Sequence, residues 1–183
     1  IVQSLSSSIG ILLDTGAEKV FIADERGSFL AEYRVPAIVT KIYLEARRLS
    51  GTPIRKMACP VSASSEMDIV AREYGVELLR TQNTHGGMMQ AVISDESIEF
   101  VAGTRGGFIF PEFLFATDAM YSVAKILEMM AITGWKLGEV DDQVPRLHRL
   151  VSDIECPWQA KGRVMRYAMH ASEENERQLI DGI

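Results

Sequence analysis

The chain has 183 residues, of which 47% are hydrophobic and 24% charged, with a net charge of −6 and a mean hydropathy of +0.05. The length suits one globular domain and the start of a second, and the composition argues against an intrinsically disordered chain. The acidic balance, without any Lys/Arg-rich run, argues against a nucleic acid or an anionic membrane as partner.

The cysteines and the apolar runs exclude two further classes of protein. Cys59 and Cys156 lie too far apart in the sequence to form a disulfide framework and are expected to be buried thiols of a cytoplasmic protein. The longest apolar run, 108–116, contains Pro111 and Glu112 and is far shorter than the ~20 residues that span a bilayer. The chain opens without basic residues and without Met, so we expect no secretory signal and a piece of a longer polypeptide.

Short strands are predicted at the start of the chain, followed by a helix. Residues 9–13 and 19–23 have the apolar pattern of strands, and residues 28–31 could return as a third strand. From Pro36 to Leu49 apolar residues recur at helical spacing, and a proline suits the first turn of a helix. We therefore expect an antiparallel meander before the first helix.

An alternation of strand and helix follows. We expect a strand over 54–60, a helix that begins at Ser64 or Ser65 and ends at Tyr74, and a strand over 76–80. Alternation with such short connections is typical of parallel strands joined by crossover helices on both faces of a sheet. The sequence thus predicts an α/β fold, a three-layer α/β/α domain with a mixed, mostly parallel central sheet.

The rest of this domain is predicted to contain a short helix over 88–93, a strand over 98–102 and one arm of a tight turn over 106–110. A long helix follows over 119–132, capped by Thr117 or Asp118 and ended by Gly134. Its apolar positions cover so much of the helix surface that we expect burial on more than one side.

Beyond Gly134 the pattern changes. Residues 144–155 alternate apolar and charged side chains, as an extended and half-exposed segment does, and we place a domain boundary near 156–157. The chain is then expected to form a helix over 157–171 and a strand over 178–183, which would open a unit that this chain does not complete.

Two loops contain ionisable side chains that suggest chemistry. The loop 14–19 (DTGAEK) places carboxylates at Asp14 and Glu18, and hard divalent cations prefer oxygen ligands of this kind; an ordinary turn is the alternative explanation. The loop 81–87 contains His85, which could donate to a phosphate or act as an acid or base, or could simply be a solvated loop histidine.

Two further loops are polar or glycine-rich. The loop 103–107 (GTRGG) lies between two apolar strands and could let backbone N–H groups approach a sugar or a phosphate. The segment 62–65 (SASS) is better explained as a helix cap than as a nucleophile, because no base or orienting group can be identified beside it.

These loops, in this order, resemble the third domain of the α-D-phosphohexomutases, the phosphomannomutase and phosphoglucomutase family. The resemblance covers 9–131 and is carried by ILLDTGAEKVFIADERG, VSASS, YGVELLRT, and GTRGGFIFPE followed by TDAMYSVAKILEMMA. It implies an end of a preceding domain or linker at 1–8, a third domain over 9–134, a linker over 135–156 and an incomplete start of the fourth domain over 157–183.

The resemblance also implies a magnesium loop that this chain only partly retains. The family's loop is usually Asp-Gly-Asp-Gly-Asp-Arg, and the matching positions here are Asp14, Gly16, Glu18 and Lys19. One anionic ligand is missing and another is longer, whereas Mg²⁺ demands nearly ideal octahedral oxygen geometry. We therefore expect Asp14 and Glu18 to be vestigial metal ligands, and no cofactor in this fragment.

The sugar-binding loop of the family is changed in the same way. It is usually Gly-Glu-x-Ser-Gly, and the matching residues here are Gly103, Thr104, Arg105, Gly106 and Gly107. Both side chains that would bond the sugar hydroxyls are absent. The family's Thr-x-Val-Gly segment corresponds to 81–84 (TQNT), and no phosphate-binding residue can be identified.

Three hypotheses follow from the resemblance. The phosphoserine loop and the fourth-domain phosphate loop are absent, so we expect no catalytic residue here, although the parent protein is expected to be an enzyme of sugar-phosphate or nucleotide-sugar metabolism. The leading hypothesis is a scaffold or regulatory domain of a sugar-1-phosphate nucleotidyltransferase, such as mannose-1-phosphate guanylyltransferase, because the final segment resembles the mutase-like regions of such fusions.

The alternative is part of an active mutase, with Asp14 and Glu18 still binding a cation and Arg105 replacing the lost polar contacts. The third hypothesis is an interaction module that forms a homo-oligomer through 157–183. The expected partners are a hexose phosphate and the remaining domains of the parent polypeptide.

Overall fold

The computed structural model describes residues 1–173, and the strand expected over 178–183 lies outside these residues. The chain divides into a first unit over Ile1–Arg146 and a second unit that begins at Leu147. In the second unit, residues 147–157 have no regular structure, and α6 (Trp158–Glu173) corresponds to the helix predicted over 157–171.

The first unit begins with an antiparallel hairpin of β1 (Gly10–Leu13) and β2 (Val20–Ala23). The third strand expected over 28–31 is reduced to a single bridge between Ala23 and Phe29. The prediction of a full strand is wrong because the chain turns into a helix at once: the Val35 amide donates to the carbonyl of Ala31 at 3.2 Å.

The central sheet has four strands in the order β4-β3-β5-β6, namely Glu77–Thr81, Lys56–Pro60, Ile98–Ala102 and Phe108–Ile109. β3 is parallel to both β4 and β5, whereas β6 returns antiparallel to β5. The mixed, mostly parallel sheet predicted from the sequence is therefore confirmed.

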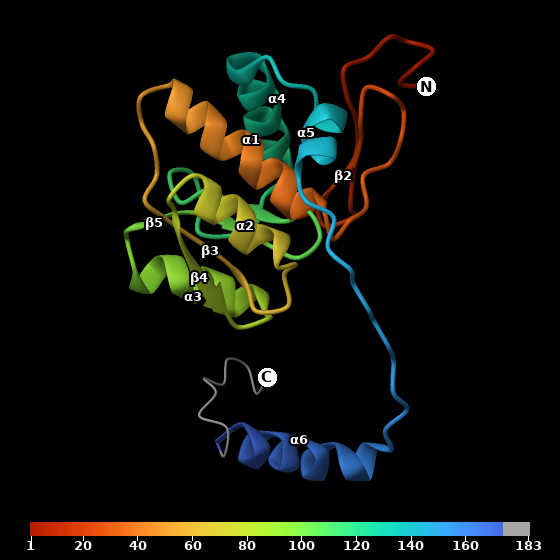
Figure 1. Cartoon of the computed structure of the whole chain (residues 1–183), viewed down its shortest axis with the longest axis vertical. Helices are drawn as coiled ribbons and strands as arrows, with labels where there is room; N and C mark the ends of the chain where they lie inside the picture. Colours follow the sequence, from red (N-terminus) through yellow and green to blue (C-terminus); the bar gives the residue numbers. More distant parts are fainter. Residues whose placement is uncertain (174–183) are drawn as a thin grey trace. The chain divides into compact units, whose positions relative to one another are not determined.

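Helices cover both faces of this sheet (Figure 1). α3 (His85–Ser94) packs on one face, against β3, β4 and β5. α1 (Val35–Leu49) and α2 (Glu66–Glu73) pack on the opposite face, and α4 (Ala119–Thr133) packs against α1. These are the three layers that the sequence predicts.

Alternate residues of the strands divide the core into two clusters. On β3, Met57 and Cys59 join the large cluster under α1, while Ala58 joins the smaller cluster under α3. On β5, Ile98 and Val101 both belong to the smaller cluster although they are three positions apart. A shift of register between β3 and β5 explains this, because a bulge inserts one residue and changes which side chains face each layer.

The linker expected over 135–156 needs correction in its first part. Residues 137–143 form α5 (Leu137–Gln143), and Leu137 and Val140 are fully buried. The compact first unit ends only at Arg146, so this segment belongs to the domain core. Within the described residues, no helix combines the length and the apolar character needed to cross a membrane.

A buried arginine holds α5 and the segment after it in place. Arg34 is only 2% exposed, and its Nε donates to Asp141 Oδ1 at 2.6 Å while its Nη1 donates to Glu66 Oε1 at 2.8 Å. Its Nη2 also donates to the carbonyls of Asp141 at 2.8 Å and Val144 at 3.0 Å. One guanidinium thus connects the start of α1 with α2, with α5 and with the end of the first unit.

We expect Arg34→Ala to lower the free energy of unfolding by about 3–5 kcal/mol, because it leaves the buried Glu66 carboxylate without its ion-pair partner. Urea unfolding of the full chain, followed by circular dichroism, measures this. The matched control is Lys136→Ala at the start of α5, which removes an exposed ion pair with Glu139 and should cost about 0–1 kcal/mol. Equal effects of the two substitutions would contradict the role given to Arg34.

The two cysteines should differ sharply in reactivity. Cys59 is fully buried in β3, and burial raises the pKa of its thiol to about 12, whereas Cys156 is partly exposed. Since the thiolate is the reactive form, we expect Ellman's reagent to modify Cys156 in the native chain and Cys59 only on unfolding. Cys156→Ser should therefore abolish the reaction of the native chain with Ellman's reagent. A reaction that persists in this variant would show that Cys59 is accessible.

Candidate functional site

The loop 14–19, predicted as a metal site, is organised around its own backbone. Asp14 Oδ1 accepts hydrogen bonds from the amides of Glu18 at 2.8 Å and Lys19 at 3.0 Å. These backbone hydrogen bonds, from Lys19 first and then Glu18, lower the pKa of the Asp14 carboxyl. Asp14 therefore closes the turn between β1 and β2.

The second carboxylate of this loop has a different neighbour. Glu18 Oε2 lies 3.7 Å from His85 Nδ1, and about half of each side chain is exposed. Among residues 1–173, no three His, Cys, Asp or Glu side chains are grouped so that they could hold a metal ion. Mg²⁺ needs an octahedral shell of oxygen ligands, and one glutamate beside a histidine does not provide it. The metal-binding role of Asp14 and Glu18 stays a prediction.

The loop 103–107, predicted to bind sugar, is fixed to Val20, the first residue of β2, and a Cβ on Gly107 would lie 3.5 Å from the carbonyl oxygen of Glu18 in the loop 14–19. The amide of Gly103 donates to the carbonyl of Gly107 at 2.7 Å, and the amide of Val20 donates to the carbonyl of Gly106 at 3.0 Å. Gly106 has φ +83°, and a Cβ there would lie 2.3 Å from the Val20 oxygen. Only glycine fits this position, so the two loops lie side by side.

The side chains of the loop 103–107 differ in exposure. Arg105 is exposed and Thr104 is partly exposed, while the glycines on either side are buried. No hydrogen bond or ion pair in the described part of the chain engages the Arg105 guanidinium, which leaves its donors available to a ligand from solvent.

The loop after β4 leads directly into α3, earlier than the sequence suggested. The predicted helix began at 88, but α3 begins at His85, with Thr84 as N-cap. Thr84 Oγ1 accepts from the amide of Gly87 at 3.0 Å, and a Cβ on Gly87 would lie 2.7 Å from the Gln82 Cβ. Thr84 is a residue type preferred at helix N-caps, and it is the sequence signal that indicates a helix start at His85.

The loop 14–19, the start of α3, β6 and the segment 116–117 line a small cavity of about 100 Å³. It is lined by the side chains of Glu18, His85, Met88, Met89, Ile109, Ala116 and Thr117. It lies beside the carboxyl ends of β4 and β5, the edge at which open α/β sheets bind ligands. The structure thus brings the loops 14–19 and 81–87 together at this cavity, and the loop 103–107 lies next to it through Gly107, beside the main chain of Glu18. The enclosed space is smaller than the ~300 Å³ at which small-molecule sites begin.

The segment 62–65 lies at the same edge but has no nucleophilic arrangement. Ser64 Oγ accepts from the amide of Glu66 at 3.3 Å, so the capping interaction of α2 comes from Ser64 and not from Ser65. Ser62 Oγ donates to Asn83 Oδ1 at 2.5 Å. These contacts agree with the structural role predicted for the segment.

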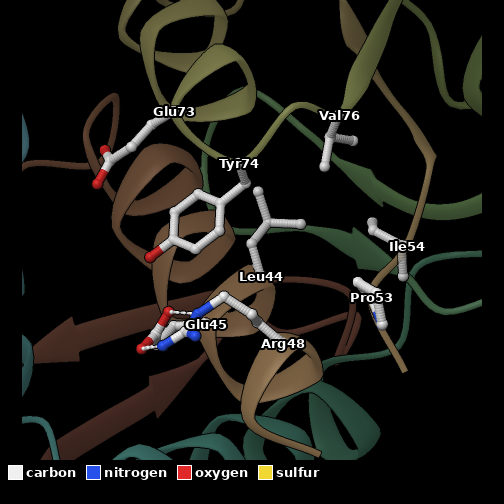
Figure 2. Close-up of a pocket in the computed structure, with 8 residues that line it drawn as sticks. All are labelled: Leu44, Glu45, Arg48, Pro53, Ile54, Glu73, Tyr74 and Val76. Atoms are coloured by element: carbon white, nitrogen blue, oxygen red, sulfur yellow. Dashed lines mark hydrogen bonds and ion pairs between the residues drawn. The ribbon is translucent and has the colours of Figure 1, made fainter. Parts of the chain in front are cut away.

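A larger cavity of about 360 Å³ lies at the opposite edge of the sheet (Figure 2). Residues before β3 and β4 form its apolar part, and α1 and α2 supply charged groups around it. These charges are already neutralised: Arg48 bonds both oxygens of Glu45, at 2.7 and 2.8 Å, and Lys41 pairs with Glu73. We therefore place the candidate site at the loop edge, where Arg105 is exposed and available.

The family model described as "Phosphoglucomutase/phosphomannomutase, alpha/beta/alpha domain III" matches residues 33–147. This is more than half of the chain, and the chain therefore belongs to the α-D-phosphohexomutase superfamily, in which it corresponds to domain III.

Its relatives carry mutase names. The chain is 28% identical over 186 residues to a probable phosphoglucosamine mutase of Methanopyrus kandleri, with 100% of this chain and 39% of the relative covered. It is 26% identical over 175 residues to a phosphoglucomutase/phosphomannomutase of Thermococcus kodakarensis, covering 95% of this chain and 37% of the relative. The chain thus spans about two fifths of the length of these curated relatives.

Solved structures share the fold at low identity. A putative phosphomannomutase from Thermus thermophilus superimposes with a TM-score of 0.64 and 18% identity, over 74% of this chain and 30% of that chain. A phosphoglucomutase/phosphomannomutase family protein from Burkholderia thailandensis gives a TM-score of 0.63 and 16% identity, over 79% and 30%. The α/β fold of the family is therefore the fold of this chain.

Gly106→Ala should destabilise the domain more than a glycine substitution at an equally left-handed but open position. Gly51 has φ +73°, and a Cβ added there would meet nothing within 4 Å, so Gly51→Ala should cost only the backbone strain of about 1–2 kcal/mol. Gly106→Ala adds the clash with Val20 and breaks the hydrogen bond between the loops, for at least about 1–3 kcal/mol more. Urea unfolding of both variants measures the difference, and equal losses would mean that the contact between the loops is dispensable.

Proposed function

We propose that this chain is the third domain of a phosphohexomutase-type protein and that its loops 14–19, 81–87 and 103–107 form the face that meets a phosphorylated hexose or hexosamine. The observation that carries the proposal is the approach of the loops 14–19 and 81–87 at Glu18 and His85, with Gly107 of the loop 103–107 against the main chain of Glu18. The phosphoglucosamine mutase and phosphomannomutase names of the relatives support this class of substrate.

Each exposed group has a defined part in this proposal. The His85 side chain lies at the first turn of α3, where its imidazole can donate to a phosphate or sugar oxygen. The Arg105 guanidinium extends from the turn 103–107, and its planar set of donors suits hydroxyl or phosphate oxygens. We assign binding and orientation to these residues, and no catalytic residue in this chain.

The activity of the longer protein is part of the same proposal. Since the chain spans about two fifths of its relatives, we propose that residues 1–8 continue from a preceding domain and that the second unit leads into a fourth. The complete protein would then interconvert hexose 1- and 6-phosphates, as an isomerase of the mutase type. Because the donor set does not fit Mg²⁺, we derive no step through a metal ion.

One observation favours a second candidate function. Asp14 Oδ1 is used to close its own turn, and the sugar loop lacks the family's Glu and Ser, so the domain has lost groups that a mutase uses. This supports a scaffold or regulatory domain fused to a sugar-1-phosphate nucleotidyltransferase such as mannose-1-phosphate guanylyltransferase. The mutase names of the relatives support the first candidate function, part of a phosphohexomutase.

A titration of the isotope-labelled chain tests the binding proposal. We expect mannose 6-phosphate and glucosamine 6-phosphate to shift the NMR signals of His85, Gly86 and residues 104–107. Arg105→Ala should weaken binding by at least about tenfold, since a charge-assisted hydrogen bond contributes about 1.5–3 kcal/mol. Arg55→Ala, which removes an exposed guanidinium before β3 at the opposite edge, is the matched control and should leave the affinity unchanged.

The same titration with unphosphorylated mannose and with inorganic phosphate shows which part of the ligand the site recognises. Shifts confined to the residues before β3 and β4, or equal effects of both arginine substitutions, would refute the proposed site. The two candidate functions are separated by assays of the longer protein: conversion of glucosamine 6-phosphate or mannose 6-phosphate into the 1-phosphate supports a mutase, and formation of a nucleotide sugar without that conversion supports the fusion.

A further inference from the structure

We propose that Arg80 is a positioning residue that fixes the loop 61–65 beside the candidate site and, through that loop, the start of α3. Its effect on ligand binding rests on the proposed function, whereas its effect on the loop does not. Arg80 lies on β4, the edge strand of the sheet, and its side chain is only 19% exposed although it carries a full charge.

The guanidinium of Arg80 joins three parts of the chain. Its Nη1 donates to the carbonyl of Ala63 at 2.9 Å and to that of Pro60 at 3.2 Å, and its Nη2 bonds Asp68 Oδ2. Pro60 is the last residue of β3, Ala63 is the middle of the loop, and Asp68 is in the first turn of α2. The planar guanidinium can satisfy all three acceptors at once, which an ammonium group cannot do in the same way.

Other contacts hold the ends of the loop and the Ala63 side chain. The carbonyls of Ser64 and Ser65 accept from amides in the first turn of α2, and Ala63 is buried in the large core cluster. The amide of Val61 donates to the carbonyl of Thr81 and the amide of Ala63 donates to that of Pro60, both at 2.9 Å. The first bond continues the ladder between β3 and β4, and the second closes a tight turn. None of these contacts uses the Ala63 carbonyl, so Arg80 supplies the hydrogen bond that fixes the peptide group in the middle of the loop.

A short series of contacts connects this loop to the candidate site. Ser62 Oγ donates to Asn83 Oδ1 at 2.5 Å, and Asn83 directly precedes Thr84, whose Oγ1 caps α3. The next residue is His85, which faces Glu18 across the small cavity. Two hydrogen bonds, Arg80 to Ala63 and Ser62 to Asn83, together with the chain between these residues, thus connect Arg80 to the turn that positions His85. Release of the loop 61–65 would remove one support of that turn.

Amide hydrogen exchange of the full chain, followed by NMR, tests this without any ligand. Loss of a charge-assisted hydrogen bond corresponds to a change of about tenfold in a local opening equilibrium. We expect Arg80→Ala to speed exchange at Val61 and Ala63 about tenfold, and at Gly87 by a smaller factor. Arg80→Lys should behave nearly as Arg80→Ala, because an ammonium on Asp68 cannot also hold both carbonyls.

The matched control is Arg72→Ala, which removes an exposed arginine from α2 and should leave all of these exchange rates unchanged. Exchange at the fully buried Val101 of β5 reports global opening and should not change in Arg80→Ala. If Arg80→Ala does not fold, Asp68→Asn weakens the same guanidinium contact and should speed exchange at Val61 and Ala63 to a smaller extent. Unchanged exchange at these two amides, or equal acceleration at Val101, would overturn the inference.

A titration with mannose 6-phosphate tests whether Arg80 also affects ligand binding. If the wild-type chain binds, Arg80→Ala should weaken the affinity several-fold while Arg72→Ala does not, and wild-type affinity in Arg80→Ala would overturn the functional half of the inference. If the wild-type chain does not bind, the proposed function fails. The role of Arg80 in the loop is then decided by the exchange rates alone.

Discussion

The buried guanidinium of Arg34 is the interaction on which the rest of the domain depends. A charge taken out of water is tolerated only when its donors are satisfied, and Arg34 achieves this with five hydrogen bonds to Glu66, Asp141, Val144 and Pro145. These partners come from α2, from α5 and from the exit of the first unit. The start of α1, α2, α5 and the end of the first unit are therefore connected through one buried side chain.

The parts of the fold that were predictable are those whose signal is local. Pro36 in the first turn of α1, Asp118 as N-cap of α4 and Gly134 as its left-handed end all act within a few residues of their own position. The Asp118 carboxylate, for example, accepts from the amide of Tyr121. The elements that escaped prediction depend on distant partners. The polar segment of α5 has only Leu137 and Val140 to bury, and it is stabilised by Arg34, which is about a hundred positions away in the sequence. The first turn of α3 was missed because its two glycines disfavour a helix unless a cap such as Thr84 compensates.

The candidate site shows the same division. Sequence patterns identified the loops 14–19, 81–87 and 103–107 as places of interest. The parallel arrangement of β3, β4 and β5 explains why the loops after β4 and β5 lie at the same edge of the sheet. The pairing of Glu18 with His85 could not be predicted, because it depends on the relative placement of the β1–β2 hairpin and α3. The use of Asp14 as a turn cap was equally hidden, since a carboxylate that closes a turn and one that binds a cation have the same sequence signature.

The loops of this site are held mainly by backbone hydrogen bonds. Their positions therefore depend little on which side chains they carry. Gly106 contacts Val20 through backbone atoms, and the amide of Ala119 donates to the carbonyl of Ala17 at 2.8 Å. Bonds of this kind survive almost any change of the side chains beside them, provided that Gly106 stays a glycine. Side chains at this edge, such as Glu18, His85 and Arg105, can therefore change without disturbing the backbone that positions them. Its chemistry must then be inferred from the groups now present at that edge, because the fold alone does not determine it.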